Sequence, residues 1–180
     1  MRTVFSMPGA LLINPSLTFC LPNRWGTLEI SSQVLAHFER HKQRKIVAPE
    51  AGGQLFATFD DPAVMKVVDV TGPRPTDKRS MFNYQPDRIA ERAEIKERYL
   101  RNLHFVGDWH THRQLMPSPS RTDEQSIREL VRFSTHDLAG FVLVVVGQAT
   151  FPQGLHVSFH SKSSSVVLTS VLNGQRETHT

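Results

Sequence analysis

The segment HTHRQLMPSPSRTD, residues 110–123, contains side chains that can bind a metal ion. His110 and His112 are one residue apart, and Asp123 follows them after a loop with two prolines. Two imidazoles and one carboxylate can hold Zn²⁺ and leave its fourth tetrahedral position open, which is the arrangement of a catalytic zinc. Water in such a position has a pKa lowered toward about 7. The spacing therefore indicates metal-assisted hydrolysis.

The stretch LHFVGDWHTH is expected to be a strand that presents both histidines on one face. Side chains alternate between the two faces of a strand, so His110 and His112 should point the same way. The same alternation places Val106 and Asp108 on the ligand face. The opposite face, toward a packed layer, should carry Phe105, Gly107 and Trp109.

The helix expected after the proline loop should bring a carboxylate back toward the histidines. Ser120 stands where a helix N-cap is expected. A period of 3.6 residues puts Asp123 on the face that carries the apolar side chains, so this face should look inward. That face consists of Ser120, Asp123, Ile127, Leu130, Val131 and Ser134. Taken alone, Ser-x-x-Asp is an ordinary capping box; after His-x-His it also indicates a site in which the Ser120 hydroxyl donates to an oxyanion.

Hydrolysis also needs a carboxylate that accepts a proton and passes it to the leaving amine. Glu50 is the best candidate, because it opens EAGGQLF, where two glycines let backbone segments approach closely. The sequence alone does not exclude other carboxylates from this role, namely Glu29, Asp60, Asp61 and Asp108. Asp108 could instead support a histidine or face solvent.

The hydrophobic pattern predicts one α/β domain, a mixed β-sheet flanked by helices, because strands and helices interleave. We divide the chain into a lead-in (1–26, with a short strand near 17–21), the domain (27–165) and a C-terminal strand or tail (166–180). The expected strands are 27–31, 50–59, 63–72, 103–112, 138–147 and 154–162. The expected helices begin at 31–32, 88 and 120, and residues 73–87 read as a loop.

Composition narrows the class of protein. The chain has 180 residues, of which 39% are hydrophobic, and its net charge of +4 is too small to establish nucleic-acid binding. The single cysteine, Cys20, excludes cysteine-rich zinc sites. Pro8 and Pro15 interrupt the first apolar run, which argues against a signal peptide. No run reaches the ~18 apolar residues of a membrane span. Because a single thiol cannot form an internal disulfide, we expect a cytoplasmic protein.

These residues resemble the JAMM motif of the JAB/MPN/Mov34 metalloprotease family. The family pattern is a glutamate before a strand, then His-x-His, seven residues, Ser, two residues and Asp; the sequence has Glu50, His110-Thr-His112, Ser120 and Asp123 at this spacing. The resemblance implies one Zn²⁺ per chain on His110, His112 and Asp123. It also implies Glu50 as general acid/base and Ser120 as oxyanion helper. Most members have proline after the second histidine, where this chain has Arg113.

The segment GDWHTH is similar to that of small bacterial JAB proteins found beside E1-like and E2-like enzymes in antiphage systems of the type II CBASS or Bil type. The resemblance implies hydrolysis of a peptide or isopeptide bond after the C-terminus of a ubiquitin-like or otherwise conjugated protein. It also implies that PRPTDKRSMFNYQ, residues 73–85, faces the substrate. The alternatives are a catalytically silent MPN scaffold and a RadC-type, nucleic-acid-associated JAMM protein, although no helix-hairpin-helix precedes the domain.

Overall fold

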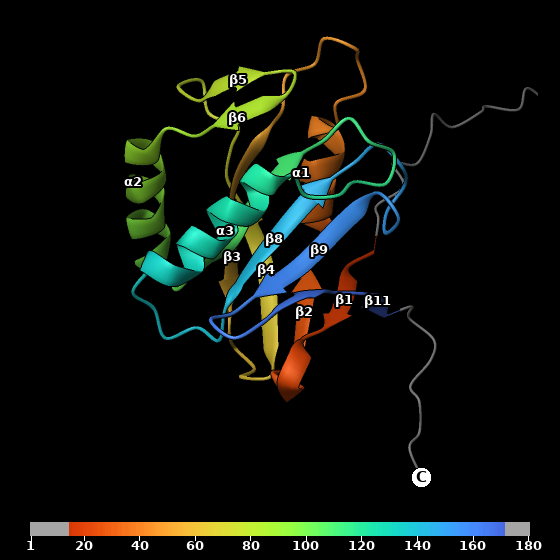
Figure 1. Cartoon of the computed structure of the whole chain (residues 1–180). Coiled ribbons are helices and arrows are strands. Elements are labelled where there is room, and N and C mark those ends of the chain that lie inside the picture. Colours follow the sequence, from red (N-terminus) through yellow and green to blue (C-terminus); the bar gives the residue numbers. More distant parts are fainter. Residues whose placement is uncertain (1–14, 172–180) are drawn as a thin grey trace, which may run out of the picture.

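The computed structural model describes residues 15–171, and these form a curled mixed sheet with three α-helices packed on it (Figure 1). The nine strands of the sheet follow the order β10-β9-β8-β7-β3-β4-β2-β1-β11. They are β1 (Leu17–Cys20), β2 (Thr27–Ile30), β3 (Gly52–Thr58), β4 (Val64–Val70), β7 (His104–Thr111), β8 (Phe141–Val146), β9 (Leu155–His160), β10 (Ser165–Val167) and β11 (Ser170–Val171). The helices are α1 (Ser32–His41), α2 (Arg88–Tyr99) and α3 (Arg121–Phe133), with a short 3-10 turn, η1 (Pro22–Arg24). This arrangement confirms the predicted α/β class.

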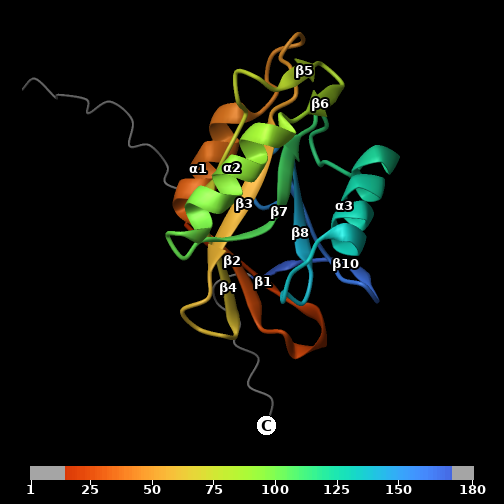
Figure 2. The same ribbon diagram turned by 90° about the vertical axis from the view of Figure 1, so that its left-hand side faces the viewer.

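The helices cover both faces of the sheet. Figure 2 shows α1 and α3 on opposite sides of β7 and β8, with α2 nearest the viewer. The first core lies under α1 and the second under α3. All six residues of β8 are buried, which confirms the predicted doubly covered strand. Its side chains alternate between the cores: Val142, Val144 and Val146 join the first, and Phe141, Leu143 and Val145 join the second.

A β-bulge in β7 changes which side chains face the histidines. Leu55 of β3 pairs with Gly107 and Phe56 pairs with Phe105, so Val106 is the extra residue. Val106 therefore joins Trp109 in the core under α1, while Phe105 packs against the core under α3. The predictions for Val106 and Phe105 are wrong, because a bulge shifts the alternation by one residue. The prediction for Trp109 is confirmed.

Gly107 makes this bulge possible. Its φ of +146° lies in a region that side chains disfavour. An added Cβ would lie 1.8 Å from the carbonyl oxygen of Val142 on the neighbouring strand. The close approach of β7 to β8 therefore requires glycine at this position.

The predicted loop 73–87 contains a two-stranded hairpin, β5 (Lys78–Ser80) and β6 (Asn83–Gln85). Its strands are too short for hydrophobic alternation to reveal them. The sheet also takes in strands on both sides of the range 27–165, since β1 pairs with β2 and with β11. The rest of the predicted lead-in and tail, residues 1–14 and 172–180, lies outside the described residues.

Helix α2 is held on the sheet mainly by ion pairs. The only buried residue of α2 is Glu91. The guanidinium of Arg74, which precedes the hairpin, is buried and binds Glu94 of α2, with Nε 3.0 Å from Oε1. Arg98 of α2 binds Asp69 of β4 at 2.8 Å. This network fixes α2 and the hairpin beside β3 and β7. Within residues 15–171, no helix is long and apolar enough to cross a membrane.

Candidate metal centre

His110, His112 and Asp123 meet where β7 ends and α3 begins. The Nε2 atoms of His110 and His112 lie 3.2 Å and 3.4 Å from Oδ2 of Asp123. One possible ligand atom from each residue lies within 4.8 Å of the other two. This geometry agrees with the two histidines sharing one strand face and with the inward turn predicted for Asp123. Ile127 and Val131 are buried on the same helix face.

The end of β7 is fixed between its neighbouring strands. The Thr111 N–H donates to the Ala51 carbonyl at 2.8 Å, and the Ala51 N–H donates to Thr111 Oγ1 at 2.9 Å. The His112 N–H donates to the Val146 carbonyl at 2.9 Å. Because Glu50 precedes Ala51, these bonds also place Glu50 beside the histidines.

The donor atoms fit a bound metal ion. His112 Nδ1 donates to the Ser118 carbonyl at 2.9 Å, which leaves the lone pair of Nε2 free for an ion. His110 Nε2 is buried and has no hydrogen-bond partner within residues 15–171, although Asp123 Oδ2 lies close. A buried polar atom without a partner is costly, and coordination would satisfy it. Two imidazoles and a carboxylate suit Zn²⁺.

The charges of the three residues also favour a cation. Burial by itself would raise the pKa of Asp123, but its interactions with the nearby His110, His112 and Ser120 outweigh it and hold that pKa well below its usual range. Burial would likewise lower the pKa of His112, yet interactions with Asp123 and Glu50 raise it above the ordinary value. The site therefore holds an anionic carboxylate that calls for a positive charge beside it.

Glu50 lines the same cavity as the three ligand candidates. Burial raises the pKa of its carboxyl to about 7, and Asp123 adds to this rise while His112 opposes it. A carboxyl group with a pKa near neutrality can both accept and return a proton. Of the competing carboxylates, Glu29 pairs with Lys66, and Asp60 and Asp61 stand at the turn between β3 and β4. Asp108 is the only one of these four that lines the cavity.

Ser120 caps α3 and also lines the cavity. Its Oγ accepts a hydrogen bond from the Asp123 N–H at 3.2 Å, and its own N–H donates to Asp123 Oδ2 at 2.6 Å. Ser120 therefore forms the capping box of α3 and lies at the candidate site at the same time. Because Oγ accepts in the cap, its hydroxyl proton is left to be donated elsewhere.

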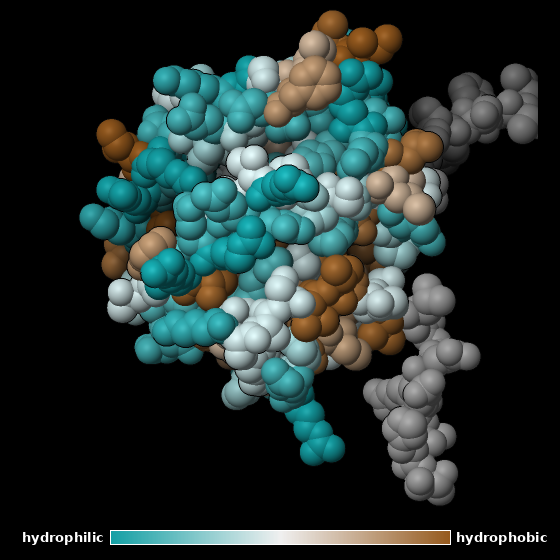
Figure 3. All heavy atoms as spheres, in the orientation of Figure 1, coloured by the Kyte–Doolittle hydropathy of each residue, from teal (hydrophilic) through white to brown (hydrophobic). Residues whose placement is uncertain are grey.

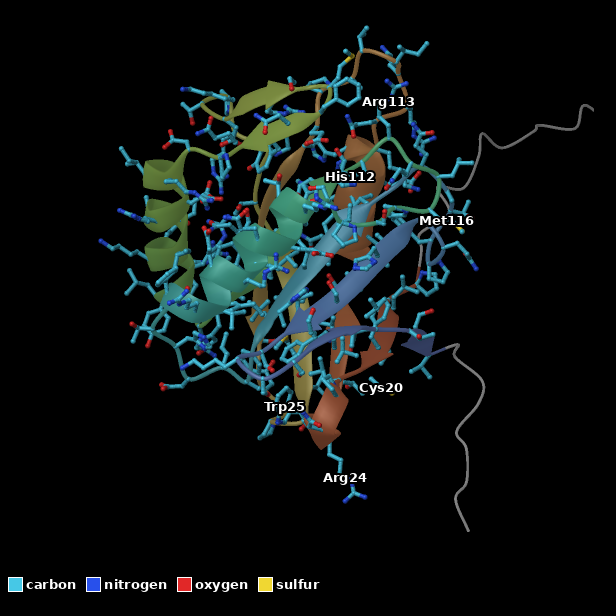
Figure 4. The ribbon with its side chains drawn as sticks, viewed as in Figure 1. Cys20, Arg24, Trp25, His112, Arg113 and Met116 are labelled. Carbon is cyan, nitrogen blue, oxygen red and sulfur yellow. The ribbon has the colours of Figure 1, made fainter. Side chains whose placement is uncertain are left out.

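The cavity has a volume of about 540 Å³ and opens between the hairpin, β7 and α3. Met81, Phe82 and Tyr84 of the hairpin segment form one wall of it. Arg113 is exposed on the rim, and Figure 4 shows it at the end of the molecule that carries the hairpin. The face in Figure 3 is largely polar, with small separate apolar patches, one of them at this end.

The sequence patterns did not predict two features of the cavity. Tyr84 packs against Gly52, where an added Cβ would lie 2.6 Å from its ring, so a glycine of EAGG makes room for the hairpin. Glu91 also lines the cavity, and no pattern indicates its burial because α2 is charged on nearly every side.

Comparisons with known proteins identify the family of the chain. Residues 31–159 match the family of prokaryotic homologs of the JAB domain. The probable metalloprotease y4qB of Sinorhizobium fredii is 30% identical over 87 residues, 46% of this chain. The match covers 53% of y4qB, about half of its length.

The fold also has a counterpart among solved structures. The solution structure of protein DSY2949 from Desulfitobacterium hafniense aligns with a TM-score of 0.55 at 16% identity and covers 77% of this chain and 87% of that one. This likeness concerns the fold alone. The family match, in contrast, spans most of the sequence and includes Glu50, His110, His112, Ser120 and Asp123. The chain belongs to the prokaryotic JAB-domain family.

Proposed function

We propose that the chain is a zinc-dependent peptidase or isopeptidase in which His110, His112 and Asp123 hold the ion. The observation that carries this proposal is the convergence of these three donors with Glu50 and Ser120 on one cavity. Family membership and the relative named as a probable metalloprotease support it. A catalytically silent scaffold would require none of the five side chains.

A bound zinc ion would polarise the carbonyl of the scissile bond and acidify a water molecule. The Glu50 carboxylate accepts a proton from the attacking water as the new C–O bond forms. It returns that proton to the nitrogen as the C–N bond breaks, which yields a carboxylate and an amine. The Ser120 hydroxyl donates a hydrogen bond to the oxyanion that develops on the carbonyl oxygen.

The proposed substrate is the C-terminal tail of a ubiquitin-like protein, in a conjugate or a precursor. An extended tail suits a site at the bottom of a cavity whose walls come from the hairpin and α3. The exposed ring of Phe82 and the side chain of Met81 offer apolar contacts at the wall. The ubiquitin-like class and an antiphage role in the cytoplasm rest on the likeness of GDWHTH to the small bacterial JAB proteins.

Metal content and hydrolysis together test the proposal. Purified chain should contain about one zinc ion, measured by inductively coupled plasma mass spectrometry. It should cleave a ubiquitin-like protein fused to a reporter at the end of the tail, with EDTA stopping cleavage and added zinc restoring it. The substrates would be fusions and isopeptide conjugates of proteins encoded by neighbouring genes. Tight zinc binding without cleavage of any of them would favour a catalytically silent scaffold.

A further inference from the structure

A groove along the sheet, between α2 and α3, continues from the metal cavity. A second cavity of about 520 Å³ lies in this groove. Four residues line both cavities: Arg88, Glu91, Asp108 and Ser126. Beyond them the walls are mixed: Ile95, Phe105, Leu130 and Phe133 are apolar, and Gln54, Arg92, Glu129 and Ser134 are polar or charged. The metal site therefore lies at one end of this groove.

The middle of the groove carries an excess of negative charge. Three carboxylates line the second cavity, those of Glu91, Asp108 and Glu129, against the two guanidinium groups of Arg88 and Arg92. Where the two cavities meet, the carboxylates of Glu91 and Asp108 face one guanidinium group, that of Arg88, which binds Glu91 at 2.8 Å. Among the described residues, neither Arg88 nor Arg92 forms an ion pair with Asp108.

The carboxylate of Asp108 is the group in the groove that lacks a partner. It is half-buried, and it makes no hydrogen bond or ion pair with any residue between 15 and 171. Glu91, beside it, is only 4% exposed. A carboxylate removed from water without a partner is unfavourable, and a cationic donor relieves this cost through a charge-assisted hydrogen bond.

We propose that the groove binds an extended segment of the substrate and that Asp108 selects a lysine or arginine side chain in it. This inference rests on the proposed hydrolase function and specifies its substrate class. The occupant follows from the charge of the groove and from its continuity with the metal cavity. The far end, where Phe133 is 72% exposed, would take an apolar side chain of the same segment.

Peptide binding to a turnover-deficient protein tests the inference directly. Fluorescein-labelled ten-residue peptides of alanine and serine would carry lysine, norleucine or glutamate at one position, moved along the sequence. Binding to zinc-loaded Glu50→Gln would be measured by fluorescence anisotropy. At one position lysine should bind about tenfold more tightly than norleucine, which has similar length without the charge, and glutamate should bind worst.

Two variants, each made in the Glu50→Gln background, assign the preference to the groove. Asp108→Asn should reduce the lysine-to-norleucine ratio to near one. Ser126→Arg, an exposed helix position that lines both cavities, should do the same by placing a cation opposite Asp108. Asp60→Asn makes the same chemical change at an exposed turn and should leave the ratio intact. Since Ser126→Arg does not alter the sheet, it remains informative if Asp108→Asn fails to fold.

Equal binding of the three peptides at every position would overturn the inference, as would an unchanged ratio in both groove variants. Other outcomes would contradict the proposed hydrolase function without contradicting the role of Asp108. A lysine preference in binding, combined with no cleavage of any peptide or conjugate by the zinc-loaded wild-type chain, would remove the hydrolase and keep the groove. Cleavage without a lysine preference would keep the hydrolase and remove the role of Asp108.

Discussion

Ala51 and Thr111 are joined by two hydrogen bonds, one from each backbone N–H, at 2.9 Å and 2.8 Å. Ala51 follows Glu50, and Thr111 stands between His110 and His112. The side chain of Thr111 is fully buried and accepts one of the two bonds. The proposed proton carrier and the proposed ligands are thus held in register by their direct neighbours.

Replacing Thr111 by valine removes the acceptor and keeps the shape of the side chain. The Ala51 N–H is then buried without a partner, which should lower the free energy of unfolding by about 1–3 kcal/mol. Urea unfolding of the metal-free protein would measure the change. Thr169→Val, at an exposed position, is the matched control and should stay within about 0.5 kcal/mol. Equal stability of the two variants would show that the Thr111 bond has no energetic role.

The double variant His110→Ala/His112→Ala should lose its zinc, because one carboxylate cannot hold the ion alone. Metal content after dialysis should fall from about one ion per chain to background. His104→Ala/His136→Ala removes two histidines outside the candidate centre and should keep the zinc. A double variant that retains the wild-type zinc content would mean that the ion binds elsewhere.

Glu50→Gln should keep the zinc and slow hydrolysis by about 10²–10⁴-fold, the usual contribution of a general acid/base. Glutamine preserves the size of the side chain but cannot take up the proton. Glu29→Gln, which changes a glutamate that pairs with Lys66 on the sheet, is the control for activity. Wild-type turnover by Glu50→Gln would assign proton transfer to another group.

The sequence patterns predict much of the centre because its ligands come from one continuous segment. The strand period and the helix period each act over a few residues, so the placement of His112 and Asp123 needs no knowledge of distant contacts. The Val106 bulge and the β5–β6 hairpin depend on pairing with other strands, which periodicity does not report. For Glu50 the residues alone left four competitors, and the pairing of β3 with β7 places it at the site.

For a related reason, the sequence could not predict that Asp108 lacks a hydrogen-bond or ion-pair partner. The strand pattern puts Asp108 on the ligand face, but the lack of a partner depends on where Arg74 and Arg88 make their own ion pairs. Those pairs join the loop after β4 to α2 or lie within α2, whereas Asp108 is on β7, further along the chain. Charge excess in a groove is therefore a property of the tertiary structure.

His160 should make the protein less stable in mild acid. Its ring is buried between the hydroxyls of Ser158 and Ser165, each 2.8 Å from a ring nitrogen. Burial first, and then the nearby His156, lower the pKa of His160 from 6.5 to about 4. Between these two pH values the unfolded chain binds a proton that the folded chain does not, so the free energy of unfolding falls as the pH falls. Above pH 6.5 both states are neutral and the effect vanishes.

His160→Gln tests this origin of acid sensitivity, because glutamine can bond to the same hydroxyls without titrating. Urea unfolding at pH 7.5 and pH 4.5, on protein freed of metal with EDTA, gives the loss of stability for each chain. The loss should be smaller in His160→Gln than in the wild type. His37 also has a pKa lowered to about 4, by burial first and then by His41, but it contributes to both chains and cancels in the comparison. An identical loss in the two chains would show that His160 protonates equally in the folded and unfolded states.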